Sequence, residues 1–254
     1  MRKALKSLVR RYRKRRNSRL GLESRDPFVV TRELTVAARP VIFDVGAHVG
    51  LAATRYRELF PEAPIHCFEP YPESFALLEA AVGALEPIEL HAIALAEAEG
   101  EAEFSVNRNS ATNSLLASDA RAAVYWRGDT PRTTGTVTVR TATLDGFCAE
   151  RSIAGIDILK MDVQGGEYEV LEGARGLLER EGIGLIYMEL ITAPTYVGQH
   201  RLREYLELFD AAGYELFDLY NFGRSLGRLL QTDVIVVSPD TLARYEEHLS
   251  GPSQ

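Results

Sequence analysis

The chain has 254 residues, of which 46% are apolar and 26% charged, a composition typical of a folded domain and not of a disordered chain. No apolar run approaches the ~18 residues of a membrane-spanning helix, which argues against an integral membrane protein. The net charge of −7 is uneven, because residues 1–25 hold 11 Lys and Arg against the single acid Glu23. This asymmetry predicts a basic N-terminal helix or tail over residues 1–25 and a single folded domain over residues 26–254.

The basic N-terminal segment leaves two interpretations open. Residues 2–20 place apolar side chains at helix spacing, with Lys and Arg on the other faces. Such a segment is either a solvated tail or a helix that lies on an anionic membrane or polymer surface. No apolar stretch follows it as in an export signal, so we expect a cytoplasmic protein, with peripheral contact at the inner membrane as an option. The acidic remainder argues against a nucleic-acid substrate.

From residue 41 onward, short apolar runs alternate with helical patterns, which indicates a mostly parallel sheet covered by helices on both faces. Strands are expected at 41–45, 65–68, 88–95, 156–161 and 183–189, and helices at 51–60, 72–84, 167–180 and 202–212. Residues 102–106 are expected to continue this sheet as a short β segment. Two late strands, 214–219 and 234–237, have a loop and no clear helix between them, so we expect them to pair antiparallel. Residues 107–134 are irregular and polar, which predicts a lid-like insertion.

The strongest chemical signal is the segment Asp44-Val45-Gly46-Ala47-His48-Val49-Gly50, placed between a predicted strand and a predicted helix. It is not a dinucleotide fingerprint, because His48 stands where the middle glycine would be, and no Gly-Lys-Ser/Thr of a phosphate-binding loop follows. Asp44 at the strand end suits a positively charged ligand, and Glu69 at the next strand end can accept protons from both ribose hydroxyls. Together they favour an adenosine ligand without phosphates, for which S-adenosylmethionine is the best candidate, with S-adenosylhomocysteine as the product.

At these residues the chain resembles the FkbM family of methyltransferases. The matching segments are Asp44 to Gly50, Phe68-Glu69-Pro70, Asn113-Ser114-Leu115, and Lys160-Met161-Asp162-Val163-Gln164-Gly165-Gly166-Glu167. The family usually has Asn in place of His48 and often an acid in place of Gln164, which weakens a catalytic or metal role at position 164. The resemblance implies a Rossmann-like class I methyltransferase fold, a seven-stranded sheet with one antiparallel strand, and methylation of hydroxyls on sugars or secondary metabolites.

The resemblance also implies which residues meet the cofactor. These are Asp44, Gly46, Ala47, His48, Gly50, Glu69, Pro70, Ala94, Ser114 and Asp162. Ala94 is expected at the adenine edge and Asp162 near the reacting methyl group. Ser114, with Asn113 and Trp126, would act as a lid that shapes the acceptor pocket, unless this segment is an ordinary surface loop.

A general base is needed if the acceptor is a weakly acidic alcohol, and three acids near strand ends are candidates. Asp162 is the first choice and Glu189 and Glu167 the alternatives. Glu167 would lie in the first turn of a helix, where an acid is favourable for the helix dipole alone. Glu189 could instead be an ordinary solvent-exposed acid at the end of a strand. His48 is expected to shape the loop or face the acceptor. The histidines at 66, 91, 200 and 248 show no metal-ligand spacing, so no metal is expected, with Mg²⁺ at Asp162 as a minor option.

The sequence therefore predicts an S-adenosylmethionine-dependent O-methyltransferase that acts on a hydroxyl of a glycan or secondary metabolite. A carboxylate or nitrogen acceptor is the alternative within the enzymes. The alternative of another class is a non-catalytic protein that keeps the fold and binds a membrane surface or an anionic polymer through residues 1–25. Cys67 and Cys148 are expected to be buried free thiols.

Overall fold

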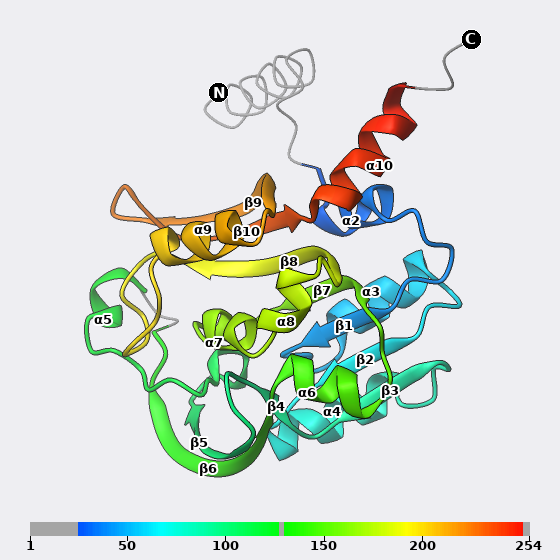
Figure 1. The fold of residues 1–254 in the computed structure, drawn as a ribbon. Helices are drawn as coiled ribbons and strands as arrows, with labels where there is room; N and C mark the ends of the chain where they lie inside the picture. Colours follow the sequence, from blue (N-terminus) through cyan, green and yellow to red (C-terminus); the bar gives the residue numbers. More distant parts are fainter. Residues whose placement is uncertain (1–24, 127–129, 251–254) are drawn as a thin grey trace, which may run out of the picture.

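The computed structural model describes residues 25–126 and 130–250, and its centre is a seven-stranded sheet of order β3-β2-β1-β7-β8-β10-β9 (Figure 1). The strands are β1 (Ile42–Val45), β2 (Ile65–Phe68), β3 (Ile88–His91), β7 (Ile156–Met161), β8 (Ile183–Ile191), β9 (Glu215–Ser225) and β10 (Arg228–Val237). All neighbours pair parallel except β10, which is antiparallel to both β8 and β9. The predicted class I sheet with one antiparallel strand is confirmed.

Helices cover both faces of this sheet (Figure 1). They are α2 (Pro27–Leu34), α3 (Leu51–Leu59), α4 (Pro72–Val82), α6 (Leu144–Glu150), α7 (Glu167–Glu172), α8 (Arg175–Glu179), α9 (Leu202–Ala211) and α10 (Pro239–Ser250). A further short helix, α5 (Ala122–Tyr125), lies away from these two layers (Figure 1). Alternate residues of β1 point to opposite faces of the sheet. Phe43 packs on the face covered by α6 to α9, and Ile42 packs on the face covered by α2 to α4. Burial of both faces explains why the central strands are short and almost wholly apolar.

Two helical features differ from the sequence-based expectations. The helix α2 was not expected, although Asp26 caps it by accepting a hydrogen bond from Phe28 N at 3.0 Å and Pro27 sets its first turn. The single helix expected over 167–180 is instead two, α7 and α8. They separate at Gly173, where a Cβ would lie 2.2 Å from the carbonyl oxygen of Ala96, so only glycine allows this approach.

A second, three-stranded sheet was not anticipated. It has the order β4-β6-β5, formed by β4 (Ala94–Leu95), β5 (Gly100–Asn107) and β6 (Thr133–Ala142). The strand expected over 88–95 therefore divides between two sheets, and residues 102–106 do not continue the main sheet. The insertion between β5 and β6 contains the short 3-10 helix η1 (Ser110–Thr112) and α5.

The late strands pair as an antiparallel hairpin, as expected, but they are longer than predicted and join through a tight turn. Leu226 and Gly227 both have positive φ, 51° and 76°, which suits a two-residue turn between twisted strands.

Cys67 and Cys148 are buried and free, as predicted. Within the described ranges, no helix combines the length and apolarity needed to cross a membrane. The predicted basic helix lies outside the described residues.

Candidate cofactor and catalytic site

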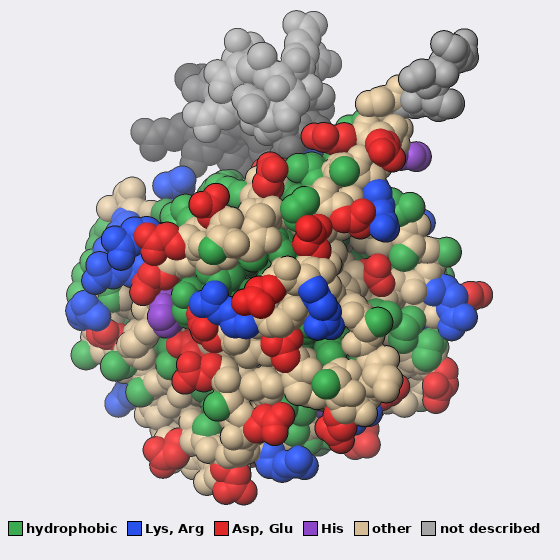
Figure 2. Space-filling model, viewed as in Figure 1, with side chains coloured by type: hydrophobic (Ala, Val, Ile, Leu, Met, Phe, Trp, Pro, Cys, Tyr) green, Lys and Arg blue, Asp and Glu red, His purple; other side chains and the backbone are tan. Residues whose placement is uncertain are grey.

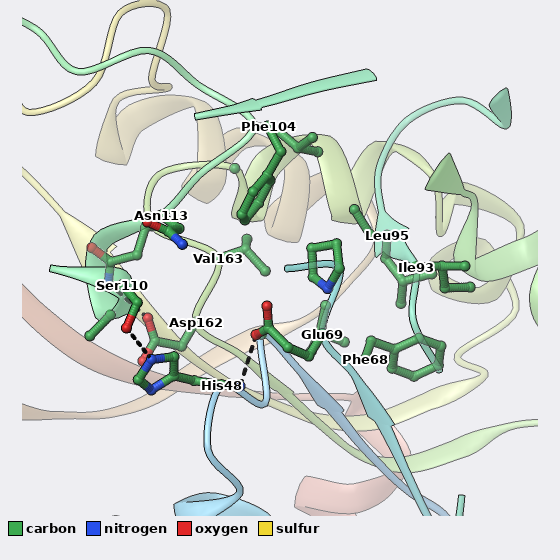
Figure 3. A pocket seen from close by; sticks show the side chains of 18 residues that line it. His48, Phe68, Glu69, Ile93, Leu95, Phe104, Ser110, Asn113, Asp162 and Val163 are labelled. Carbon is green, nitrogen blue, oxygen red and sulfur yellow. Dashed lines mark hydrogen bonds between the residues drawn. The ribbon is translucent and has the colours of Figure 1, made fainter. Parts of the chain in front are cut away.

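A cavity of about 710 Å³, counting its open mouth, lies at the carboxyl ends of β1, β2 and β7, where open α/β sheets bind ligands. Figure 3 shows Glu69, Asp162 and His48 on one side and the apolar side chains of Phe104, Ile93 and Leu95 around the rest. The lining residues are Val45, Gly46, His48, Phe68, Glu69, Pro70, Ile93, Ala94, Leu95, Phe104, Ser110, Ala111, Asn113, Leu115, Asp162, Val163, Gln164 and Gly166.

Glu69 is a buried carboxylate in the wall of this cavity. Its Oε2 accepts a hydrogen bond from His48 N at 3.0 Å, and its Oε1 accepts one from Tyr71 N at 2.9 Å. Burial raises the pKa of Glu69 to about 7, although these two backbone donors lower it. Each oxygen keeps a further lone pair, so the carboxylate can accept two more hydrogen bonds from a ligand.

The glycine-containing loop reaches the cavity because Gly46 and His48 adopt positive φ, 74° and 48°. A Cβ at position 46 would lie 2.0 Å from the carbonyl oxygen of Asp162, so glycine is required here by the neighbouring strand end. His48 lines the cavity, and its Nε2 lies 3.0 Å from Ser110 Oγ on η1. Burial lowers the pKa of His48, which favours the neutral imidazole.

Asp44 lies beneath the cavity and not in its wall. It is fully buried, and its Oδ1 lies 3.0 Å from Nζ of the buried Lys160, its register partner on β7. Lys160 Nζ also donates to the carbonyl oxygen of Gly46 at 3.3 Å. Burial lowers the pKa of Lys160, but Asp44, Asp162 and Glu189 outweigh it and raise the pKa. The ion pair therefore anchors the loop that carries Gly46.

Asn113 supplies an unused donor to the cavity. Its Oδ1 accepts from Asn107 N at 2.7 Å, while its buried Nδ2 has no partner among the described residues. Figure 3 shows this nitrogen turned toward the cavity. A buried amide without a partner is costly, so the position suits a ligand with an acceptor atom. With Glu69 as acceptor and Phe68 and Phe104 as apolar walls, the residues fit an adenosine-bearing cofactor.

Beside the cavity, Gln164 joins two acids into one network. Its Nε2 donates to Asp162 Oδ1 at 2.9 Å and to Glu189 Oε2 at 2.8 Å, and its Oε1 accepts from Tyr196 Oη at 2.9 Å. Asp162 and Gln164 line the cavity, whereas Glu189 lies behind them. Burial and the charge of Asp162 raise the pKa of Glu189 well above its usual value. Glu189 therefore holds its proton more tightly than an ordinary glutamate does.

Asp233 of β10 completes this polar group, and the sequence-based analysis missed it. It is the register partner of Glu189, and it accepts hydrogen bonds from Tyr187 Oη and Asn221 Nδ2, both at 2.7 Å. Burial raises its pKa, with a further contribution from Asp162. The only signal in the sequence was the position of Asp233 directly before the apolar run 234–237. Its place beside Glu189 depended on an antiparallel register that the sequence did not specify.

Glu167 and Ser114 act on the loop after β7 and do not line the cavity. The buried Glu167 accepts hydrogen bonds from Val163 N at 2.9 Å and Gly165 N at 3.0 Å. Burial raises the pKa of Glu167 to about 7. Ser114 Oγ donates to the carbonyl oxygen of Gln164 at 2.9 Å. Both side chains therefore hold the loop that carries Gln164.

The predicted site residues thus divide into two groups. Those that line the cavity are Gly46, His48, Glu69, Pro70, Ala94 and Asp162. Those that the structure places behind its wall are Asp44, Ala47, Gly50, Ser114, Glu167 and Glu189. Trp126 also lies away from it and donates from Nε1 to Thr195 Oγ1 at 2.8 Å. The insertion contributes four residues to the wall: Ser110, Ala111, Asn113 and Leu115.

Comparisons with known proteins identify a family and several similar proteins. Residues 44–216 match the family model described as the methyltransferase FkbM domain. The 2-O-methyltransferase NoeI of Sinorhizobium fredii is 32% identical over 180 residues, covering 68% of this chain and 72% of that protein. Methyltransferase sdnD of Sordaria araneosa is 27% identical over 157 residues, covering 54% and 61%. The solved structure of methyltransferase FkbM from Methylobacillus flagellatus KT aligns with a TM-score of 0.45 at 13% identity, covering 78% of this chain and 44% of that chain.

Proposed function

The chain belongs to the FkbM family of methyltransferases, and from this premise we propose that it transfers the methyl group of S-adenosylmethionine to a hydroxyl oxygen of a glycan or a secondary metabolite. The family assignment establishes a methyltransferase. The choice of oxygen is supported by the carboxylate network of Asp162, Gln164 and Glu189 at the cavity, and by the 2-O-methyltransferase named among the relatives.

S-adenosylmethionine would supply an electrophilic methyl group on a positively charged sulfur. In the proposed arrangement Glu69 accepts hydrogen bonds from the ribose hydroxyls, and Phe68, Ile93 and Ala94 contact the adenine. Asn113 Nδ2 offers a donor to an acceptor atom of the same ligand. These residues come from β2, β4, the loop before β4 and the insertion, so the second sheet closes the cavity over the main sheet.

The acceptor hydroxyl must lose its proton as the new bond to oxygen forms. We place Asp162 as the group that takes this proton, because it is the acid of the network that lines the cavity. Glu189 acts as a positioning residue, because Gln164 Nε2 donates to both Glu189 and Asp162 and so holds the Asp162 carboxylate in place. Alignment of the acceptor oxygen with the methyl group supplies the other large part of the rate.

Replacement of Asp162 by asparagine is expected to lower kcat about 100- to 10,000-fold for a hydroxyl acceptor, the usual contribution of a positioned base. The measurement is transfer of labelled methyl from S-adenosylmethionine to a panel of sugar and secondary-metabolite hydroxyls. The same Asp-to-Asn change at the exposed Asp240 is the control and is expected to have no effect. Full turnover of the Asp162 variant would favour a carboxylate acceptor, which needs no base.

Direct binding of the cofactor separates the enzyme from a non-catalytic protein of the same fold. Calorimetry is expected to give saturable binding of S-adenosylmethionine, and no binding at millimolar ligand would remove the basis for the proposal. A nitrogen acceptor would be recognised by methyl transfer to amines in the same panel.

The surface charge argues against a nucleic-acid substrate. Figure 2 shows acidic side chains with Lys and Arg interspersed on one face, a pattern different from the continuous basic surface of nucleic-acid-binding proteins.

We further propose that the protein works in the cytoplasm and that residues 1–25 draw it to the inner membrane surface. The support is their 11 Lys and Arg, since each basic residue near an anionic surface contributes about 1 kcal/mol. Co-sedimentation with vesicles rich in anionic lipid is expected for the full chain and lost when residues 1–25 are removed. Equal sedimentation of both proteins, or binding to neutral vesicles, would contradict this proposal.

A further inference from the structure

A second cluster of side chains with metal-ligand chemistry lies at the β3 edge of the main sheet, away from the cavity wall. His66 lies on β2, and Glu89 and His91 lie on β3. The parallel register places Glu89 opposite His66 and His91 opposite Phe68, so all three side chains point to the face covered by α6. No metal-ligand spacing marks this group in the sequence, because the 25-residue separation of His66 and His91 includes the crossover from β2 to β3.

The ligand atoms of the cluster lie close enough together to share one metal ion. His66 Nδ1 lies 3.2 Å from His91 Nε2 and 3.7 Å from Glu89 Oε2, and the three ligand atoms all lie within 4.8 Å of one another. Two nitrogens bound to Zn²⁺ at about 2.0–2.1 Å in tetrahedral geometry are ~3.3 Å apart. The two imidazoles therefore already have the separation that a shared zinc ion requires.

The surroundings hold both rings in place and leave the cluster open on one side. Phe147 of α6 packs edge-on against the ring of His66 at 6.0 Å and that of His91 at 4.9 Å. Burial lowers the pKa of both imidazoles, that of His91 to about 4, so both are neutral near pH 7 as a metal ligand must be. The side chain of Glu89 is 58% exposed, which gives an ion access from solvent.

We propose that His66, His91 and Glu89 form a zinc-binding site that ties β2 to β3. The two ring nitrogens and the Glu89 carboxylate are three ligands, and a water molecule from the exposed side fills the fourth position. His66 Nδ1 and His91 Nε2 face each other, and one of them carries a proton. When the metal binds, that proton moves to the other nitrogen of the same ring, so both facing nitrogens are free to bind the metal. Arg151, whose Nη1 lies 3.7 Å from Glu89 Oε2, is the competing cation that the metal displaces.

The site would support the cofactor cavity from outside. The ring of His91 lies 4.9 Å from that of Phe68, which lines the cavity, and Ile93 follows two residues later. Zinc would hold β2 and β3 together beside Phe68. This role does not depend on which acceptor the enzyme methylates.

The test uses the full, untagged chain freed of metal by chelation and titrated with Zn²⁺ alone in a calorimeter. Binding of one equivalent is expected, with a rise in Tm. His66→Gln and His91→Gln are each expected to weaken it about 100-fold, and Glu89→Gln about 10-fold, in line with the effects of losing ligands or their supports. His248→Gln, which removes an exposed histidine on α10, is the matched control and leaves the affinity unchanged. Arg151→Gln is expected to strengthen it several-fold, since a nearby positive charge is removed.

Two measurements keep the result clear if a variant folds poorly. Binding of S-adenosylmethionine by each variant reports that the domain is intact. Titration of the unmodified chain with Co²⁺ is expected to give the strong visible absorption of a four-coordinate site. The proposal is overturned by weak, non-stoichiometric Zn²⁺ binding, by binding that survives in both histidine variants, or by six-coordinate Co²⁺ with its faint absorption.

Discussion

Replacement of Glu69 by glutamine is expected to lower the affinity for S-adenosylmethionine about 100-fold or more. The carboxylate accepts from His48 N and Tyr71 N and offers its remaining lone pairs to the ligand. The amide turns an NH2 group toward one of these backbone donors and loses a charged acceptor, and hydrogen bonds to charged groups are each worth about 1.5–3 kcal/mol. A 100-fold change corresponds to about 2.7 kcal/mol. Calorimetry measures the loss directly.

The pH dependence of S-adenosylmethionine binding gives a second test of the role of Glu69. Because burial raises the pKa of Glu69 to about 7, the free carboxyl becomes protonated as the pH falls through that value. The ionised form binds the ribose hydroxyls, so the affinity is expected to fall with decreasing pH below about 7 and to level off above it. The Glu69→Gln variant should show a flat profile over this range. Glu73→Gln, an exposed neighbour on α4, is the control, and unchanged affinity at position 69 would refute the assignment.

Replacement of Lys160 by methionine is expected to be the most destabilising of the changes considered. It leaves the carboxylate of Asp44 fully buried and without its cation, and removing one partner of a buried ion pair costs about 3–5 kcal/mol. For a domain of this size that corresponds to a fall in Tm of about 10 °C. Thermal unfolding followed by circular dichroism measures the effect.

Two further variants test whether the loss arises from the unpaired charge. The double change Asp44→Asn with Lys160→Met is expected to be more stable than Lys160→Met alone, because position 44 then carries no unpaired charge. Arg244→Met breaks the exposed ion pair with Asp240, where both side chains are more than half exposed, and should change stability by less than about 1 kcal/mol. Equal stability of the single and double variants at 44 and 160 would show that packing, not charge, holds this part of the core.

Much of the cofactor side of the cavity was predictable, because it depends on local rules. Short apolar runs gave the strands, and the residue after a strand end lies at the carboxyl edge of a parallel sheet. Glu69, Gly46 and His48 were found in this way, and the structure brings all three to the cavity. Positive φ at Gly46 and His48 also follows from a tight turn between strand and helix.

The roles of the buried acids were not predictable from position along the chain. Asp44 lies within β1 and pairs with Lys160, whereas Glu167 begins α7 and accepts hydrogen bonds from Val163 N and Gly165 N. A strand end does not tell whether a side chain points into the cavity or behind it. That choice depends on which face of the sheet the residue occupies and on the neighbour that lies across it.

The sequence by itself determined the fold class and the family, because hydrophobic periodicity and the motifs around residues 44–50, 69 and 160–167 are local patterns. Only the tertiary structure decided which residues meet. The register between β8 and β10 places Asp233 beside Glu189, and the crossover between β2 and β3 brings His91 to His66. Contacts of this kind are fixed by the order and register of strands that lie far apart in the chain, and no local pattern encodes them.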